Sequence, residues 1–271
     1  MSLNRIWQGA LAATPDKPAL IVDGTTTSYR ALAEAIDRSA GKLLALGVGS
    51  GDRLALFMRN RAELVELYFA CFRIGASALP LNHRFQLDEV VYAVDHCRAK
   101  VVVADGPLFS VVATLPEAAQ SIDRVYVHGD APERATHRWA DVAGAAPEAA
   151  DWPLVADDQP AMILYTSGST GRPKGVTHTH GSIFAVASAR VTTQQLSAED
   201  VSVAATAVCH AGGSIGVSFP TLLAGGTVVI LAESTPEVFL DAMAHRPTRA
   251  VLLPAQLLDV IDHPRAAGVD F

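Results

Sequence analysis

Residues 165–176 read YTSGSTGRPKGV, and this stretch decides how the chain is interpreted. Four serine and threonine side chains and three glycines accompany a single lysine, Lys174. Glycine lets a backbone turn sharply and approach a ligand closely, so that successive N–H groups can converge on an anion. The apolar run AMILYT before it predicts a strand, which puts the stretch at the carboxyl edge of a sheet, where α/β proteins bind ligands. We expect a loop that holds a phosphate chain rather than a slack turn.

Two common nucleotide-binding fingerprints do not fit. A Walker A loop requires G-x-x-x-x-G-K-[ST], but the sixth position counted from Gly168 is Pro173, and Lys174 is followed by Gly175. The stretch GVGSGD at 47–52 fails the G-x-G-x-x-G pattern because Asp52 takes the last glycine position. The spacing disfavours a kinase or another P-loop NTPase.

Strand and helix patterns alternate along the chain, which predicts an α/β fold with layered, mostly parallel sheets and helices on both faces. Asp23 and Gly24 predict the turn of a hairpin within 18–29, and Asn60 with Glu63 predicts a capping box that opens a helix ending at Gly75. The Ala- and Pro-rich stretch 131–160 is interpreted as a surface excursion or linker. Further strands are expected at 53–58, 77–81, 100–105, 124–128, 161–166, 201–208, 227–231 and 249–254, and helices at 29–47, 86–99, 178–191 and 235–246.

The stretch YTSGSTGRPKGV resembles the signature Y-T-S-G-[ST]-T-G-x-P-K-G-V of the adenylate-forming (AMP-binding) superfamily, and it matches every fixed position. The likeness covers nearly the whole chain, because S-Y-x-x-L at 28–32, G-V-x-x-G-D-R at 47–53, IGASALPLN at 74–82 and LLAGGTVVIL at 222–231 also resemble family elements. The resemblance implies that 1–271 is part of the large N-terminal AMP-binding domain. It suggests subdomains at 50–190 and at 1–49 plus 191–271, with the mobile C-terminal domain absent.

Within this superfamily, the resemblance implies an acyl-CoA synthetase that uses ATP, Mg²⁺ and coenzyme A. A carboxylic acid would be converted to an acyl-adenylate and then to a CoA thioester. Thr166 and Lys174 would take the catalytic role at the loop, and no metal ligand is identified. The residues expected to bind the ATP phosphates are Thr166, Ser167, Gly168, Ser169, Thr170, Gly171, Lys174 and Gly175.

A second element, AVCHAGG at 207–213, resembles the P-L-F-H-x-x-G stretch of acyl-CoA ligases more than the F-D-x-S of peptide-synthetase adenylation domains. The resemblance implies that His210, Ala211, Gly212 and Gly213 line the pocket for the acid. A satisfied core histidine is the alternative for His210. Ala207 and Cys209 depart from the pattern, and the acid is left open among fatty, aryl and short-chain acids.

Charge, cysteine spacing and the lack of long apolar runs limit the binding partners and the cellular location that we expect. The formal net charge of −7 disfavours a general nucleic-acid binder, which needs excess basic residues. Three widely spaced cysteines, in no CxxC pair, suit a reducing cytoplasm, and Cys209 is expected to be a buried small hydrophobe. His178 and His180 lack a third metal ligand nearby, which disfavours a metal site. Thr179 and His180 match a T-H element of the family, so we expect these two residues to shape a helix start. We expect no signal peptide, no membrane span and a cytoplasmic protein, and a homodimer is compatible with the resemblance.

Several family features are absent from the sequence. The chain has no Y-G-x-T-E motif and no C-terminal adenylation lysine. We therefore expect the 271 residues alone to show little or no ATP–pyrophosphate exchange. The alternative is a non-catalytic nucleotide- or partner-binding module of the same fold.

Overall fold

The computed structural model describes residues 3–145, 152–166 and 172–269 of the chain. The described residues divide into two compact units, which are treated separately below. The first comprises 1–3, 35–59 and 66–182, and the second comprises 4–34, 60–65 and 183–271.

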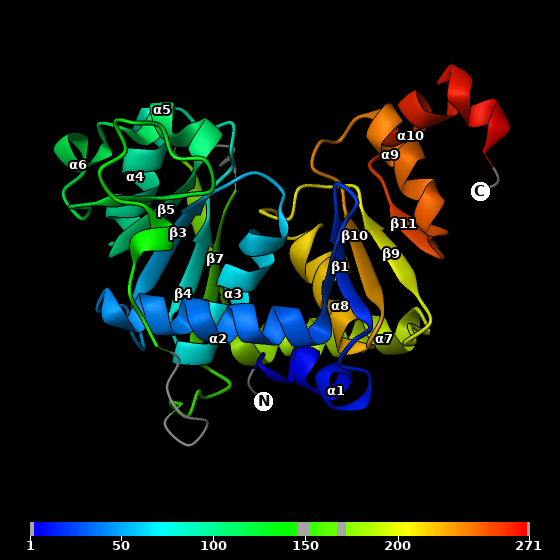
Figure 1. Ribbon diagram of the computed structural model, residues 1–271, viewed down its shortest axis with the longest axis horizontal. Coiled ribbons are helices and arrows are strands. Elements are labelled where there is room, and N and C mark those ends of the chain that lie inside the picture. Colours follow the sequence, from blue (N-terminus) through cyan, green and yellow to red (C-terminus); the bar gives the residue numbers. More distant parts are fainter. Residues whose placement is uncertain (1–2, 146–151, 167–171, 270–271) are drawn as a thin grey trace. The chain divides into compact units, whose positions relative to one another are not determined.

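A six-stranded sheet forms the centre of the first unit (Figure 1). Its strand order is β6-β5-β3-β4-β7-β8, and every neighbouring pair is parallel except β7 with β8. The central strands are continuous apolar runs, which is the pattern of strands covered on both faces. The strands are β3 Arg53–Phe57, β4 Ser77–Pro80, β5 Val101–Asp105, β6 Val125–His128, β7 Pro160–Thr166 and β8 Lys174–Thr179.

The helices of this unit bury apolar faces on the sheet. In α4, the residues Val90, Ala93 and Val94 follow a helical period and pack in one core with Ala55 of β3 and Val102 of β5. The helices that lie wholly in this unit are α4 Leu87–Cys97, α5 Phe109–Val112 and α6 Leu115–Ala118, together with the short 3₁₀ turns η1 Gly106–Leu108 and η2 Trp139–Asp141.

A five-stranded sheet forms the centre of the second unit, in the order β11-β9-β10-β1-β2. All its neighbouring pairs are parallel except β1 with β2, which form the expected hairpin. Asp23 and Gly24 both take positive φ, 47° and 74°, as a two-residue hairpin turn requires. The strands are β1 Pro18–Val22, β2 Thr25–Ser28, β9 Val201–Ala204, β10 Thr227–Ile230 and β11 Arg249–Val251.

Side chains of the second unit tie its strands to its turns. The Tyr29 hydroxyl donates to the carbonyl of Gly226 at 2.7 Å, and Lys17 Nζ donates to the carbonyls of Ala198 and Gly225. The helices of this unit are α1 Arg5–Ala13, α8 Phe219–Leu223, α9 Pro236–Ala242 and α10 Pro254–Ile261, with η4 Ser214–Ser218, η5 Met243–His245 and η6 Pro264–Gly268. Three helices contain a boundary between units: α2 Tyr29–Ala45, α3 Ala62–Ile74 and α7 His180–Thr193.

The fold class expected from the sequence is confirmed, because both sheets are mostly parallel and carry helices. Ser28 caps the start of α2, since its hydroxyl accepts from the N–H of Ala31. One expected cap is wrong. The Asn60 side chain does not cap α3, because it bonds instead to backbone groups of Val208 and Leu231. Of the stretch 131–160, the structure describes 131–145 and 152–160, where the 3₁₀ turn η2 precedes the start of β7 at Pro160.

Candidate functional site

The described residues of the expected phosphate loop lie at the loop end of an antiparallel hairpin made by β7 and β8. Thr166 pairs with Lys174, and Tyr165 pairs with Gly175. The buried apolar residues 161–164 of β7 fix this strand in the sheet, and the strand ends at the exposed residue Thr166. Ser167, Gly168, Ser169, Thr170 and Gly171 lie outside the described residues. The structure therefore brings together Thr166, Lys174 and Gly175 of the expected phosphate-binding set.

Lys174 is the cation of this hairpin. Its side chain is exposed, and among the described residues no ion pair or hydrogen bond occupies its ammonium group. The other three lysines all hold backbone carbonyls: Lys17 bonds Gly225, Lys42 bonds Trp139 and Lys100 bonds Gly47. A compact ammonium on a flexible stem binds phosphate as a point charge. Lys174 is thus an exposed, unengaged cation at the loop end of the hairpin, within the described part of the chain.

The side chains of Ile163 and Tyr165 pack closely against the backbone of Gly175. A Cβ built at this position would lie 3.1 Å from Cγ2 of Ile163 and 3.4 Å from Cζ of Tyr165. The Tyr165 ring covers the bare backbone opposite it, which is a way for an aromatic residue to stabilise a strand glycine. Gly175 therefore serves the packing of the hairpin base.

An open depression of about 720 Å³ lies beside the hairpin, within the first unit. Sequence reasoning missed it, since no motif marks the residues of α4 that line it. Arg172 and Pro173 supply its other side. Its lining includes Asp88, Glu89, Tyr92, Asp95 and His96 of α4.

The second candidate element, residues 207–213, leads into a π-helical turn, η4. The N–H and hydroxyl of Ser214 both donate to the carbonyl of His210, at 3.1 and 2.8 Å. His210 is exposed, and the partial burial of its imidazole lowers its pKa from the ordinary value. π-helical turns are frequent at functional sites. The turn holds the backbone of His210 while its ring stays accessible.

The glycines of this element differ in role. A Cβ at Gly213 would lie 2.6 Å from the carbonyl oxygens of both Thr206 and Ala207, so only glycine fits there. Gly212 and Ala211 are exposed, and a Cβ at Gly212 would meet only the Thr206 side chain, at 3.3 Å. Gly213 shapes the loop, whereas His210, Ala211 and Gly212 form its exposed surface.

Asn60 fixes this loop and was missed as a site residue. Its amide donates to the carbonyl of Leu231 at 2.8 Å and accepts from the N–H of Val208 at 2.9 Å. The side chain is buried, so both bonds are shielded from water. Asn60 thereby joins the loop after β9 to the end of β10. Its contact in that loop, Val208, lies two residues before His210.

His178, His180, Cys71 and Cys209 are candidates from the sequence for metal ligands or reactive groups. His178 lies in β8, and His180 begins α7, where the Thr179 and Ser182 side chains cap the helix reciprocally. Among the described residues there is no cluster of three or more His, Cys, Asp or Glu side chains that could hold a metal ion. Cys71 and Cys209 are buried, and burial raises the pKa of the Cys71 thiol.

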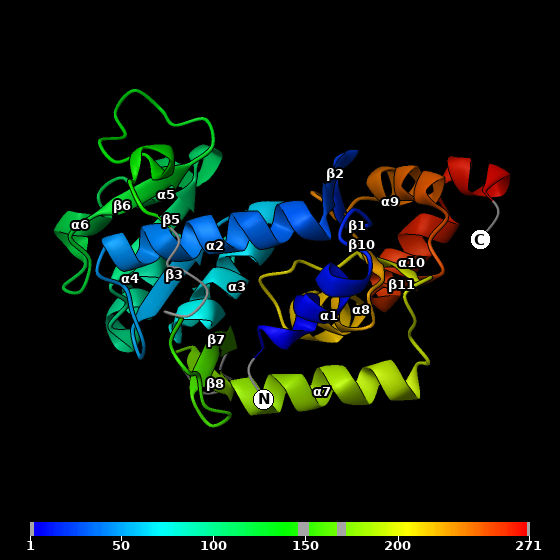
Figure 2. The same cartoon turned by 60° about the horizontal axis from the view of Figure 1, so that its bottom comes forward.

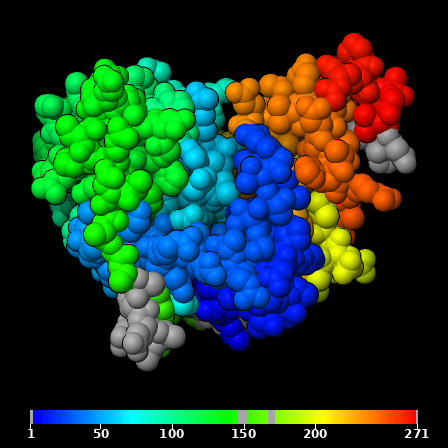
Figure 3. Space-filling view, viewed as in Figure 1, coloured from blue at the N-terminus to red at the C-terminus, as the bar shows by residue number. Residues whose placement is uncertain are grey.

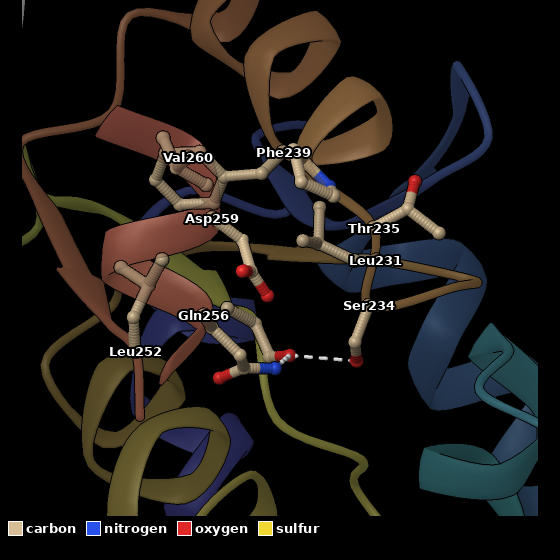
Figure 4. Close-up of a pocket in the computed structure, with 10 residues that line it drawn as sticks. Leu231, Ser234, Thr235, Phe239, Leu252, Gln256, Asp259 and Val260 are labelled. Atoms are coloured by element: carbon tan, nitrogen blue, oxygen red, sulfur yellow. Dashed lines mark hydrogen bonds between the residues drawn. The ribbon is translucent and has the colours of Figure 1, made fainter. Parts of the chain in front are cut away.

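A small cavity in the second unit has the wrong size for a substrate (Figure 4). Its volume is about 20 Å³, which is room for one water molecule. Ser234 and Gln256 converge on the carbonyl of Ala205, at 2.9 and 3.2 Å, so its polar groups already bond one another. It is a joint between α10 and the segment before α9.

Comparison with known proteins shows the family of the chain. The model of the family described as AMP-binding enzyme matches residues 7–270. The chain belongs to the AMP-binding enzyme family. Feruloyl-CoA synthase of Amycolatopsis sp. is 31% identical over 258 residues, which are 95% of this chain and 50% of that protein. The medium-chain fatty-acid–CoA ligase of Escherichia coli K12 is 31% identical over 93% of this chain and 46% of its own length.

Solved structures of the family share the fold. A benzoate CoA ligase from Burkholderia xenovorans LB400 superposes with a TM-score of 0.84 at 26% identity, over 98% of this chain and 53% of that one. The chain thus spans about half the length of the curated relatives it matches. None of the helices in the described part of this family member is long and apolar enough to cross a membrane.

Proposed function

We propose that the complete protein is an ATP-dependent acid:CoA ligase. The observation that carries this proposal is the position of Lys174, which pairs with Thr166 at the loop end of the β7–β8 hairpin. Its side chain is exposed, and no described residue forms an ion pair or hydrogen bond with its ammonium group. The names of relatives support it, since they include a feruloyl-CoA synthase, a fatty-acid–CoA ligase and a benzoate CoA ligase.

The proposed reaction has two steps. A carboxylate oxygen attacks the α-phosphorus of ATP, the bond from that phosphorus to the bridging oxygen breaks, and pyrophosphate leaves with the electron pair. The thiol of coenzyme A then attacks the carbonyl carbon of the acyl-adenylate, AMP leaves, and the thiol proton is released. Lys174 and Thr166 act on the first step, because a fixed cation and a hydroxyl donor stabilise charge that develops on the leaving pyrophosphate.

Mg²⁺ would enter with ATP, as the family resemblance implies. The described residues provide no cluster of metal-ligating side chains, so they do not fit a resident metal and we assign no step to one. In the proposal, 1–271 is part of the large AMP-binding domain, with subdomains at 50–190 and at 1–49 plus 191–271. A cytoplasmic location and a homodimer belong to the same proposal.

Pyrophosphate exchange in the complete protein tests the proposal. A panel of fatty, aryl and short-chain acids is offered with ATP and Mg²⁺, and incorporation of labelled pyrophosphate into ATP is measured. At least one acid should support exchange. If none does, the non-catalytic module of the same fold is favoured. The prediction that residues 1–271 alone exchange little is tested in the same assay.

Lys174→Ala provides the residue-level test. We expect kcat/KM for ATP to fall by about 10- to 100-fold, since a bond from a charged group contributes roughly 1.5–3 kcal/mol. Lys100→Ala is the matched control, because Lys100 is a surface lysine of the same unit that pairs with Asp52. An equal loss in both variants would remove Lys174 from the phosphate site.

A further inference from the structure

Helix α4 bonds to the segment that leads into β8. The hydroxyl of Tyr92 donates to the carbonyl of Pro173 at 3.0 Å. The guanidinium of Arg172 lies over the Tyr92 ring, with Cζ 5.4 Å from its centre, within the range of a cation–π contact. Arg172 and Pro173 directly precede Lys174 in the chain. The backbone on the lysine side of the hairpin is therefore held from outside the hairpin.

The same helix holds the other strand one turn further along. The hydroxyl of Tyr165, next to Thr166, lies 2.7 Å from Nδ1 of His96 and 3.2 Å from Sγ of Cys97. Burial raises the pKa of Tyr165 well above its ordinary value, and hydrogen bonding to Cys97 adds to this. The phenol thus stays protonated and can donate a hydrogen bond across the physiological range.

Three rings connect these two attachments, and we call Tyr92, His96 and Tyr165 the ring cluster. Tyr92 and His96 are four residues apart on α4 and stack at 5.4 Å with planes 15° apart. Tyr165 meets both rings edge-on, at 6.1 and 6.0 Å. Two of its rings lie on α4, which is itself packed in the sheet core, and the third lies on β7. The cluster therefore connects the segment before Lys174 and the strand that ends at Thr166 to the same helix.

From this geometry we propose that Tyr92 is a positioning residue for Lys174. Tyr92 and His96 hold the residues before Lys174 and before Thr166, so the ammonium starts from a fixed base. A lysine has a flexible four-carbon stem, and fixing its backbone removes part of the freedom that anion binding would otherwise remove. This inference rests on the proposed function in one respect, namely that the anion is the polyphosphate of ATP.

Tyr92→Phe in the complete protein tests the role without removing the ring. We expect KM for ATP to rise by about fivefold, the loss from one neutral hydrogen bond, with KM for the acid unchanged. Tyr29→Phe is the matched control, because it also removes a tyrosine bond to a backbone carbonyl, in the other unit. A purely structural effect would lower the melting temperature in both variants and leave KM for ATP unchanged, which would overturn the proposal.

A double-mutant cycle shows whether Tyr92 acts through the lysine. In the Lys174→Ala background, Tyr92→Phe should change the dissociation constant for ATP, measured by titration calorimetry, by less than about twofold. Full additivity, with the same fivefold loss in both backgrounds, would contradict action through Lys174.

Proteolysis gives a readout that does not depend on activity. Trypsin can cleave after Lys174, whereas the neighbouring Arg172–Pro173 bond resists it because trypsin does not cut before proline. Cleavage of the Lys174–Gly175 bond requires β8 to open locally. Tyr92→Phe should speed this cleavage by about fivefold, and Tyr29→Phe should not. Unchanged cleavage with normal exchange would sink the inference and leave the ligase proposal standing. Faster cleavage in a protein that shows no exchange with any acid would contradict the ligase proposal, and it would support the role of Tyr92 in holding the hairpin.

Discussion

His180 is a histidine that the folded chain keeps neutral. Its side chain is fully buried, and its Nδ1 accepts a hydrogen bond from the N–H of Leu3 at 3.3 Å. The Phe72 ring lies edge-on at 5.5 Å. Burial lowers the pKa of His180 from 6.5 to about 4, because the charged imidazolium would lose its hydration. At the residue scale, one buried ring therefore links folding to pH.

The sign of this link follows from which state binds the proton. Between about pH 6.5 and 4 the unfolded chain protonates His180 and the folded chain does not, so stability falls as pH falls. We expect the free energy of unfolding to drop by about 2 kcal/mol between pH 7.5 and 5.0 from this group. Urea unfolding measures the drop. In His180→Phe it should be smaller by that amount, and an equal drop in both proteins would contradict the assignment.

His210 is the residue whose role the structure leaves to experiment. His210 is an exposed residue on the loop before η4, and partial burial of its imidazole lowers its pKa. We expect His210→Ala in the complete protein to change the ratio of kcat/KM between two acids by about tenfold, with KM for ATP unchanged. His263→Ala is the control, since His263 pairs with Glu237 elsewhere in the same unit. An unchanged acid profile would remove His210 from the pocket.

At the scale of elements, the sequence predicted what local patterns encode. The apolar runs of the central strands, the Asp23-Gly24 turn and the helix of α4 are set by neighbouring residues, and all were found. Strand β8 was missed, because KGVTHT has neither an apolar run nor alternation and is an exposed edge strand (Figure 2). Asn60 was misread because its partners lie 148 and 171 residues away. Contacts at such separations leave no local signal.

The loop after β9 gives a prediction at this scale. Gly213→Ala should destabilise the fold by about 1–3 kcal/mol, since the added methyl group meets two carbonyl oxygens of the same loop. Gly9→Ala is the matched control. Gly9 lies in α1 with nothing within 4 Å of an added Cβ, so the change should stabilise by about 0.5–1 kcal/mol. Thermal unfolding distinguishes them, and a neutral Gly213→Ala would show that the loop can yield.

At the scale of the molecule, exposed apolar side chains gather near the end of the second unit. Val251, Leu253, Leu257, Leu258 and Ile261 are each 45–60% exposed. Four of them lie just before or on α10, and Val251 ends β11, the edge strand of its sheet. This segment runs from orange to red in Figure 3. Contiguous apolar surface beside an open strand edge favours association.

We therefore expect the 271-residue chain to associate in solution. Replacing Leu257 and Leu258 together by Lys should shift sedimentation velocity profiles toward the monomer, because charge on this face opposes its burial. Leu44→Lys is the control, since Leu44 is a single exposed leucine on α2. If the double variant sediments as the parent chain does, the apolar face does not drive association.

The attachment of both hairpin strands to α4 has a consequence for protein engineering. Thr166 pairs with Lys174, and the residues that precede them, Tyr165 and Pro173, both bond to α4. A library that varies the length and sequence of 167–171 would therefore start from a constant frame, with the lysine always facing the same threonine. The hairpin base can serve as a graft site, into which anion-binding loops are exchanged as cassettes and compared on equal terms.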